Sequence, residues 1–133
     1  MKTPDGDLRA YFQGLTIAGA AIFDRVTEQQ ALPYIHISDL NCDNFNTATE
    51  DLYDCEVLFD IVTGFQANTG GRKLSDTIST SLLNAVIDNR VAIGDFYINR
   101  CQLLNTTYID DYTESQLIIR KLVRVQFIVE QVK

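Results

Sequence analysis

Apolar side chains at the odd positions of Leu52–Val62 alternate with mostly acidic ones, and this alternation is the clearest structural signal in the chain. One face of such a segment carries the apolar side chains, and the other face carries the acids Asp54, Glu56 and Asp60. A period of two is typical of a strand with one buried and one wet face. Ser115–Val129 has the same pattern, with apolar side chains at most odd positions. We therefore expect two long strands, each with one face in the core.

Two other segments have the periodicity of helices. Over Leu8–Leu15 the apolar side chains recur at spacings of three and four, and Asp5 or Asp7 can cap the N-terminus of this short helix. The segment Arg72–Ile87 has a longer apolar stripe with Ser, Thr and Asn side chains opposite, which predicts the main helix. The stripe consists of Leu74, Ile78, Leu82, Ala85 and Val86.

Four further segments have weaker strand patterns: Ala20–Val26, Leu32–Leu40, Val91–Ile98 and Gln102–Ile109. The resulting order of helix, strands, helix and strands predicts an α+β fold. We expect a mostly antiparallel sheet with one main helix packed on its face and a short N-terminal helix. The length fits one domain over residues 1–133. The order of the strands in the sheet stays open at this point.

The net charge of −7 is concentrated in one part of the 133-residue chain. Val26–Gly71 holds eight acidic residues and no Lys or Arg, whereas Arg72–Lys133 holds eight basic and seven acidic residues. Nonspecific DNA binding draws most of its affinity from a basic surface, so this charge argues against a protein that grips DNA. The acidic segment is either a solvated face, which is the simpler interpretation, or a surface that repels an anion or attracts a basic partner.

Several classes of function find no support in the sequence. No apolar run approaches the ~20 residues of a membrane span, and the N-terminal residues lack the hydrophobic core of a signal peptide. Cys42, Cys55 and Cys101 are odd in number and widely spaced, which argues against a disulfide framework or a zinc site and fits a reducing cytoplasm. The only histidine, His36, is not part of a recognisable nucleophile–base pair in the sequence, so we expect neither catalysis nor a cofactor.

The segment Asp39–Glu50 has the spacing of a calcium-binding loop. Asp39, Asn41, Asp43 and Glu50 stand at positions 1, 3, 5 and 12 of an EF-hand pattern, where oxygen ligands belong. The sixth position is Asn rather than Gly, and the preceding segment is a predicted strand rather than a helix. We therefore favour a polar, mobile loop, and keep a small calcium- or ligand-binding module as the alternative.

The densest basic cluster is Arg120, Lys121 and Arg124 in the last predicted strand. Arg120 and Arg124 share one face of that strand, and Lys121 lies on the other face. We expect the two arginines to pair with the acids of Leu52–Val62, either across strands or between subunits, rather than with nucleic acid.

Two short stretches of the sequence resemble a known family. Ile22–Val26 reads IFDRV, and after a polar spacer Ala31–Ile37 reads ALPYIHI; a short helix precedes them, and an acidic strand, a helix and a long strand follow. This order is similar to that of the small tail-completion proteins of long-tailed bacteriophages and prophages, the tail terminator or tail-to-head joining family. The segment Asn41–Thr49 departs from the family as a long polar insert.

The resemblance implies a structural protein without catalysis or cofactors. Such proteins form a ring, commonly a hexamer, that caps the tail tube and meets the head connector proteins while DNA passes through without specific binding. The protein is then assembled in the host cytoplasm and resides in the virion; a head-completion protein of the same interface is the alternative. For the oligomer interface we predict Arg120, Arg124, Glu56 and Asp54. For a loop facing the lumen or a partner we predict Asp39, Asp43, Glu50 and Asp51.

Overall fold

The two segments with the strictest alternation lie side by side at the centre of one sheet. In the computed structural model, which describes residues 3–15, 17, 20–25, 32–46, 51–66, 72–87, 92–112 and 116–131, six strands pair in the order β1-β2-β3-β6-β5-β4. All neighbours are antiparallel except β1 and β2. The elements are α1 (Asp5–Gln13), β1 (Ala21–Phe23), β2 (Tyr34–Asn44), β3 (Leu52–Gln66), α2 (Lys73–Ile87), β4 (Ala92–Ile93), β5 (Phe96–Tyr112) and β6 (Gln116–Gln131).

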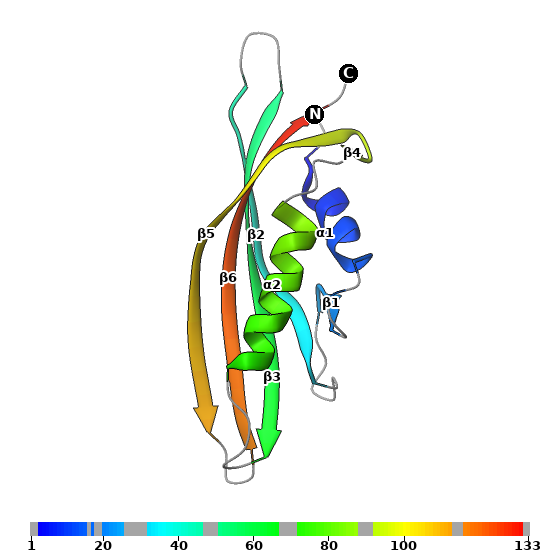
Figure 1. Ribbon diagram of the computed structural model, residues 1–133. Helices are drawn as coiled ribbons and strands as arrows, with labels where there is room; N and C mark the ends of the chain where they lie inside the picture. Colours follow the sequence, from blue (N-terminus) through cyan, green and yellow to red (C-terminus); the bar gives the residue numbers. More distant parts are fainter. Residues whose placement is uncertain are drawn as a thin grey trace.

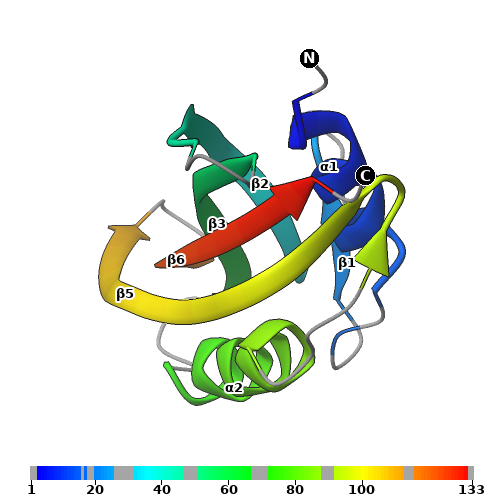
Figure 2. The same ribbon diagram turned by 90° about the horizontal axis from the view of Figure 1, so that it is seen from above.

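Both helices cover the same face of this sheet (Figure 1), and seen from above the sheet curls toward them (Figure 2). The odd positions of β3 and β6 supply the core side of the sheet, because these side chains are almost all buried. The α+β prediction, with one main helix on a mostly antiparallel sheet and a short N-terminal helix, is confirmed. No helix within the described ranges is long and apolar enough to cross a membrane.

An aromatic cluster fixes α1 to the centre of the sheet. The Phe12 ring is fully buried and meets Phe59 of β3 edge to face, with 5.1 Å between the ring centroids, and Phe127 of β6 at 5.4 Å. Leu8, one turn earlier on the same helix face, is also fully buried. Burying a side chain of this size stabilises the fold by about 1.5–3 kcal/mol, so two residues attach this nine-residue helix.

The N-terminus of α1 and the apolar stripe of α2 differ from the prediction. The N-cap of α1 is Pro4, with no side-chain cap, while Asp5 and Asp7 lie inside the first turn, where negative charge favours the helix dipole. In α2 the buried positions are Ser75, Ile78, Ser79, Leu82 and Val86, whereas Leu74 is 36% exposed. The helix is therefore rotated so that small hydroxyl side chains, not Leu74, allow its first turn to approach the sheet.

Two strand predictions were wrong in extent. The segments Val91–Ile98 and Gln102–Ile109 are a two-residue strand, β4, followed by one long strand, β5. β5 contains irregularities at Ile98/Arg100 and Leu103/Asn105, and each one moves the following side chains out of the simple alternation. In addition, β2 continues to Asn44, so the first four residues of the predicted polar loop Asn41–Thr49 form a strand, while residues 47–49 lie outside the described part.

The turn between β4 and β5 generates a first prediction. Gly94 has φ = +55°, and a Cβ on it would lie 2.6 Å from Asp7 Oδ2. Gly94→Ala should therefore lower the free energy of unfolding in urea by about 1–3 kcal/mol. Gly6→Ala in α1 is the matched control, since nothing lies within 4 Å of its Cβ position. That control should be neutral or stabilise by about 0.5–1 kcal/mol, and an equal loss in both variants would contradict the argument.

Candidate functional site: the uncovered face of the sheet

The face of the sheet turned away from α1 and α2, called the uncovered face below, carries nearly all the residues that the sequence singled out. Even-numbered positions of β3 and β6 point to this side, because their odd-numbered neighbours are in the core. The register of β2 against β3 places two more acids on the same side. Its acidic half, in β2 and β3, consists of Asp39, Asp43, Asp54, Glu56 and Asp60, and its two arginines in β6 are Arg120 and Arg124.

Arg120 and Asp60 form the strongest charged contact on the uncovered face. The Arg120 Nη2 and Nε atoms lie 2.6 Å and 3.1 Å from Asp60 Oδ2, and Nε lies 3.3 Å from Oδ1. The Asp60 side chain is only 6% exposed, so the Arg120 guanidinium replaces water in stabilising the charge of its carboxylate. The hydrogen bonds with Asp60 raise the pKa of Arg120 above its ordinary value, although burial acts in the opposite direction. Burial, and then the Asp60 charge, also raise the pKa of the adjacent Tyr34.

The second arginine pair is looser. Arg124 Nη1 lies 3.9 Å from Glu56 Oε2, and both side chains are more than a third exposed, so this pair contributes little to stability. The cross-strand pairing predicted from the sequence is thus present at both arginines. Their assignment, with Glu56 and Asp54, to an oligomer interface stays a prediction.

Amide side chains continue the polar surface toward β5. Gln126 Nε2 donates to Asp54 Oδ1 at 2.9 Å, and Gln102 Nε2 donates to Gln126 Oε1 at 2.7 Å. This chain of hydrogen bonds crosses from β3 through β6 to β5. It holds Asp54 without supplying a positive charge to balance it.

The acids of β2 have no such compensation. Asp39 and Asp43 are exposed on the outer strand, and within the described residues neither makes an ion pair. Asp43 stands directly opposite Asp54 in the register of β2 and β3, an arrangement of like charges that is unfavourable unless a cation or a partner balances it.

The predicted lumen or partner loop is only partly described. The backbone carbonyl of Asp51 accepts a hydrogen bond from the Gln131 backbone N–H at 3.0 Å, and Glu50 lies outside the described residues. Asp39 to Asn44 form an extended strand, so the EF-hand alternative is wrong for this stretch, since such a loop turns sharply at its sixth position. No group of three or more His, Cys, Asp or Glu in the described part of the chain could hold a metal ion.

A polar cluster that the sequence analysis missed lies on the covered side, between α2 and the sheet. Lys121 Nζ lies 2.9 Å from Asp76 Oδ1, and the Tyr108 hydroxyl donates to the same carboxylate. The Arg72 guanidinium lies 4.3 Å from the centroid of the Tyr108 ring and pairs with Asp110 at 3.0 Å. The one signal for it was the single Lys among apolar odd positions of β6, because a nearly buried Lys requires a carboxylate.

The charges of this cluster stabilise one another. The hydrogen bonds from Tyr108 and then from Lys121 hold the pKa of Asp76 below its usual 3.8. Burial lowers the pKa of Lys121, but its contacts with Asp76 and Tyr108 outweigh burial, so the pKa lies above 10.5. Both groups therefore stay charged at neutral pH, which makes the cluster an anchor for α2 rather than an acid–base pair.

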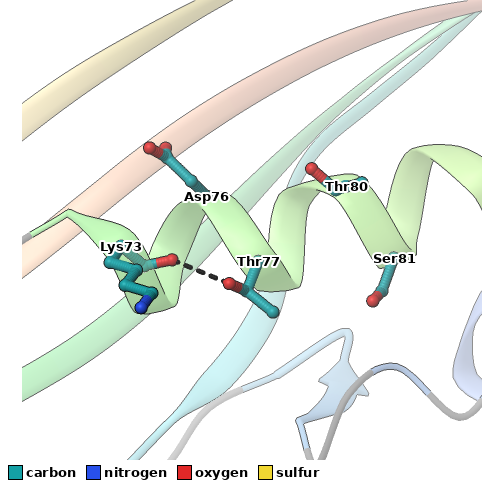
Figure 3. Close-up of a pocket in the computed structure, with 5 residues that line it drawn as sticks. All are labelled: Lys73, Asp76, Thr77, Thr80 and Ser81. Carbon is teal, nitrogen blue, oxygen red and sulfur yellow. Dashed lines mark hydrogen bonds between the residues drawn. The ribbon is translucent and has the colours of Figure 1, made fainter.

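A hollow along α2 does not provide an active site either. It is lined by Lys73, Asp76, Thr77, Thr80 and Ser81, and Figure 3 shows Asp76 pointing away from Ser81. The Thr77 hydroxyl donates to the carbonyl of Lys73 at 2.9 Å, so the helix itself occupies this group. His36 is distant in the fold from this helix, on β2, and its Nε2 lies 3.1 Å from the Asp24 carbonyl; since a carbonyl only accepts, this nitrogen carries the proton.

Comparison with known proteins gives a family and a fold. The family model described as Tail completion protein gp17 matches residues 4–130, which confirms the resemblance inferred from Ile22–Ile37. A chain of the virion of a native gene transfer agent particle has the same fold, with a TM-score of 0.66 and 12% sequence identity, over 92% of this chain and 93% of that one. No curated protein matches the sequence.

The contrast between the two arginines is testable. Arg120→Gln leaves the buried Asp60 carboxylate without its cation and should lower the free energy of unfolding by about 1–3 kcal/mol in urea at pH 7. Arg124→Gln, the matched control, should change it by less than about 0.5 kcal/mol. Adding Asp60→Asn to Arg120→Gln should recover part of the loss, and no recovery would mean that the uncompensated charge is not the cause.

The anchor of α2 should give acid-dependent stability. Because the pKa of Asp76 is depressed in the fold, its contribution is present above pH 3.8 and is lost as the pH falls through the folded-state pKa. Asp76→Asn should therefore lower the melting temperature at pH 7, and the difference from the native chain should shrink below pH 3.8. Asp111→Asn, an exposed β5 carboxylate without a described ion pair, is the control. Parallel curves for Asp76→Asn and the native chain would contradict the assignment.

Proposed function

The chain belongs to the tail completion protein gp17 family, and on that basis we propose that it forms a ring that caps the tail tube, joins it to the head connector and lets DNA pass through. Family membership makes the chain a structural, non-catalytic component of the phage virion tail, which assembles with other virion proteins. The ring, its number of subunits and its neighbours are the proposal. We propose six copies, with the tail tube protein on one side and the head–tail connector proteins on the other.

The negative charge of the uncovered face supports the proposal that DNA passes through the ring without binding. Its β2–β3 half holds five carboxylates and no Lys or Arg. Two of the five, Asp60 and Glu56, are balanced by arginines, which leaves Asp39, Asp43 and Asp54 to set the local potential. A channel wall with this charge repels phosphates within about one Debye length, ~8 Å at physiological salt, so DNA slides past without being held.

The remaining predicted residues fit this arrangement as proposals. With the uncovered face toward the lumen, Asp39 and Asp43 line the channel, and we propose Glu50 and Asp51 as further lumen or partner residues. Arg124 and Glu56 are available to a neighbouring copy because they are half-buried and loosely paired, and Asp54 is available because no positive charge balances it. Arg120 is the weakest of the interface predictions, since Asp60 of the same chain already occupies its guanidinium.

Solution mass and electron microscopy test the proposal together. We expect light scattering to give six times the 15.0 kDa chain mass, either alone or once tail tubes are added, and images to place this density at one end of each tube. A chain that stays monomeric with tubes present, or that binds along their sides, would contradict the capping ring. A map of the ring with Asp39 and Asp54 on the outer rim would remove the lumen assignment and leave the ring intact.

A further inference from the structure

Two strands of the sheet have long outer edges without a partner strand. β1 pairs only with Tyr34–His36 of β2, so in the described part of the chain the outer edge of β2 is open from Ser38 to Asn44. β4 pairs only with Phe96 and Tyr97, so among the described residues the outer edge of β5 is open over the rest of its length to Tyr112. The two open edges lie on opposite sides of the sheet, because β2 and β5 flank β3 and β6 in the order β2-β3-β6-β5. Unpaired backbone groups of this kind are templates for another strand.

The open edge of β5 is also the most apolar exposed surface of the described residues. Five of the seven exposed large hydrophobic side chains lie on this strand. Beyond the part paired with β4, four of them, between 37% and 74% exposed, follow one another along the open edge: Leu103, Leu104, Ile109 and Tyr112. A free protein protects such an edge with charged side chains, Pro or bulges; β5 has no Lys or Pro, and its charged residues Arg100, Asp110 and Asp111 leave the stretch from Cys101 to Ile109 without a charge. The edge therefore has the character of an interface that is covered after assembly.

We infer that the open edge of β5 pairs with the open edge of β2 of the next copy, so that the sheets of all copies join around the ring. The direction of the strands supports this pairing. β2, β3, β6 and β5 alternate in direction, so β5 runs opposite to β2. Copies in a ring differ only by rotation, and when the axis lies along the strands every copy keeps the same strand directions. β5 then meets the next β2 antiparallel, through a heterologous contact of the kind that closes rings.

The side chains that meet in this pairing are complementary. One row of paired residues crosses the sheet on the uncovered face. In this row Asp43 of β2 pairs with Asp54, Asp54 pairs with Ile128, and Ile128 pairs with Arg100 of β5. If the rows continue into the next copy, Arg100, which has no carboxylate partner among the described residues, stands beside Asp43, which has no cation. Arg100 of the next copy then balances Asp43 only, so Asp39 and Asp54 keep the uncovered face negative.

The next rows on the other face are apolar. Leu40 of β2 shares its row with Leu103 of β5, which is 42% exposed, and Cys42 shares its row with Cys101. These contacts would cover part of the hydrophobic surface of β5. The occupant of the edge is thus a second copy of this chain, and the inference rests on the proposed ring while specifying its interface.

The native cysteines provide the test. Directly opposed residues on the same face of antiparallel strands have Cβ atoms about 4.5–5.5 Å apart, close to what a disulfide requires. Virions that carry the chain with Cys55→Ala are oxidised with copper phenanthroline and run without reducing agent. The alanine is needed because Cys55 stands directly opposite Cys42 in the same chain. We expect a ladder of covalent oligomers through Cys42 and Cys101, and its loss when Cys101→Ser is added.

Two further variants allow for a shift of register. Both variants carry Cys42→Ser, which removes the native thiol of β2. One adds Leu40→Cys and the other adds Asn44→Cys, so that the new thiol lies two residues away on the same face of β2. A ladder from any one of the three positions supports the edge pairing and gives its register.

Cross-linking with glutaraldehyde on the same virions reports whether copies of the chain lie next to one another at all. Oligomers with glutaraldehyde but no disulfide ladder from any position would overturn the edge pairing and leave the ring standing. The absence of glutaraldehyde oligomers would contradict the ring, and the pairing with it.

Discussion

The structure depends on the fifteen consecutive residue pairs between β3 and β6, in which one face of both strands is apolar except at Thr63 and Lys121. Shifting this register by one residue would turn every core side chain of a strand to the wet side, so the pairing has one solution. The aromatic contacts of Phe12 and the buried face of α2 then have a fixed surface to pack against. The same constraint leaves the opposite face polar, and the acids of β3 with Arg120 and Arg124 of β6 are placed on it as a consequence.

The pleat also separates charges that are adjacent in the sequence. Arg120, Lys121 and Arg124 form one basic cluster along the chain, but each contacts a different carboxylate, and Lys121 lies on the other side of the sheet. Arg120 neutralises a buried acid and Lys121 holds α2, which leaves Arg124 as the weakly held cation of the three. The dense basic cluster of the sequence is therefore not one continuous basic surface in the fold.

The sequence predicted what the alternation determines and missed what depends on contacts across the sheet. β3, β6 and α2 were found because their periodicity runs over many residues. β5 was split in two because Asn99 and Leu104 stand at its irregularities, where the alternation is broken. The polar end of β2 has the sequence pattern of a loop. An outer strand that extends past the core buries little of either face, so Asn41 to Asn44 have no apolar pattern. Leu74 follows helical periodicity but lies outside the contact, which only the position of the sheet decides.

The irregularities of β2 and β5 have a geometrical meaning for an assembly of identical copies. Each bulge bends its strand and increases the local twist, and together they give the sheet the curl seen from above (Figure 2). In a closed circle every copy must turn the wall by the same angle, and that angle fixes how many copies complete it. In the proposed ring, three local distortions of the backbone, two in β5 and one between Ile37 and Asp39 in β2, therefore help to set the diameter of the bore, together with the surfaces that meet.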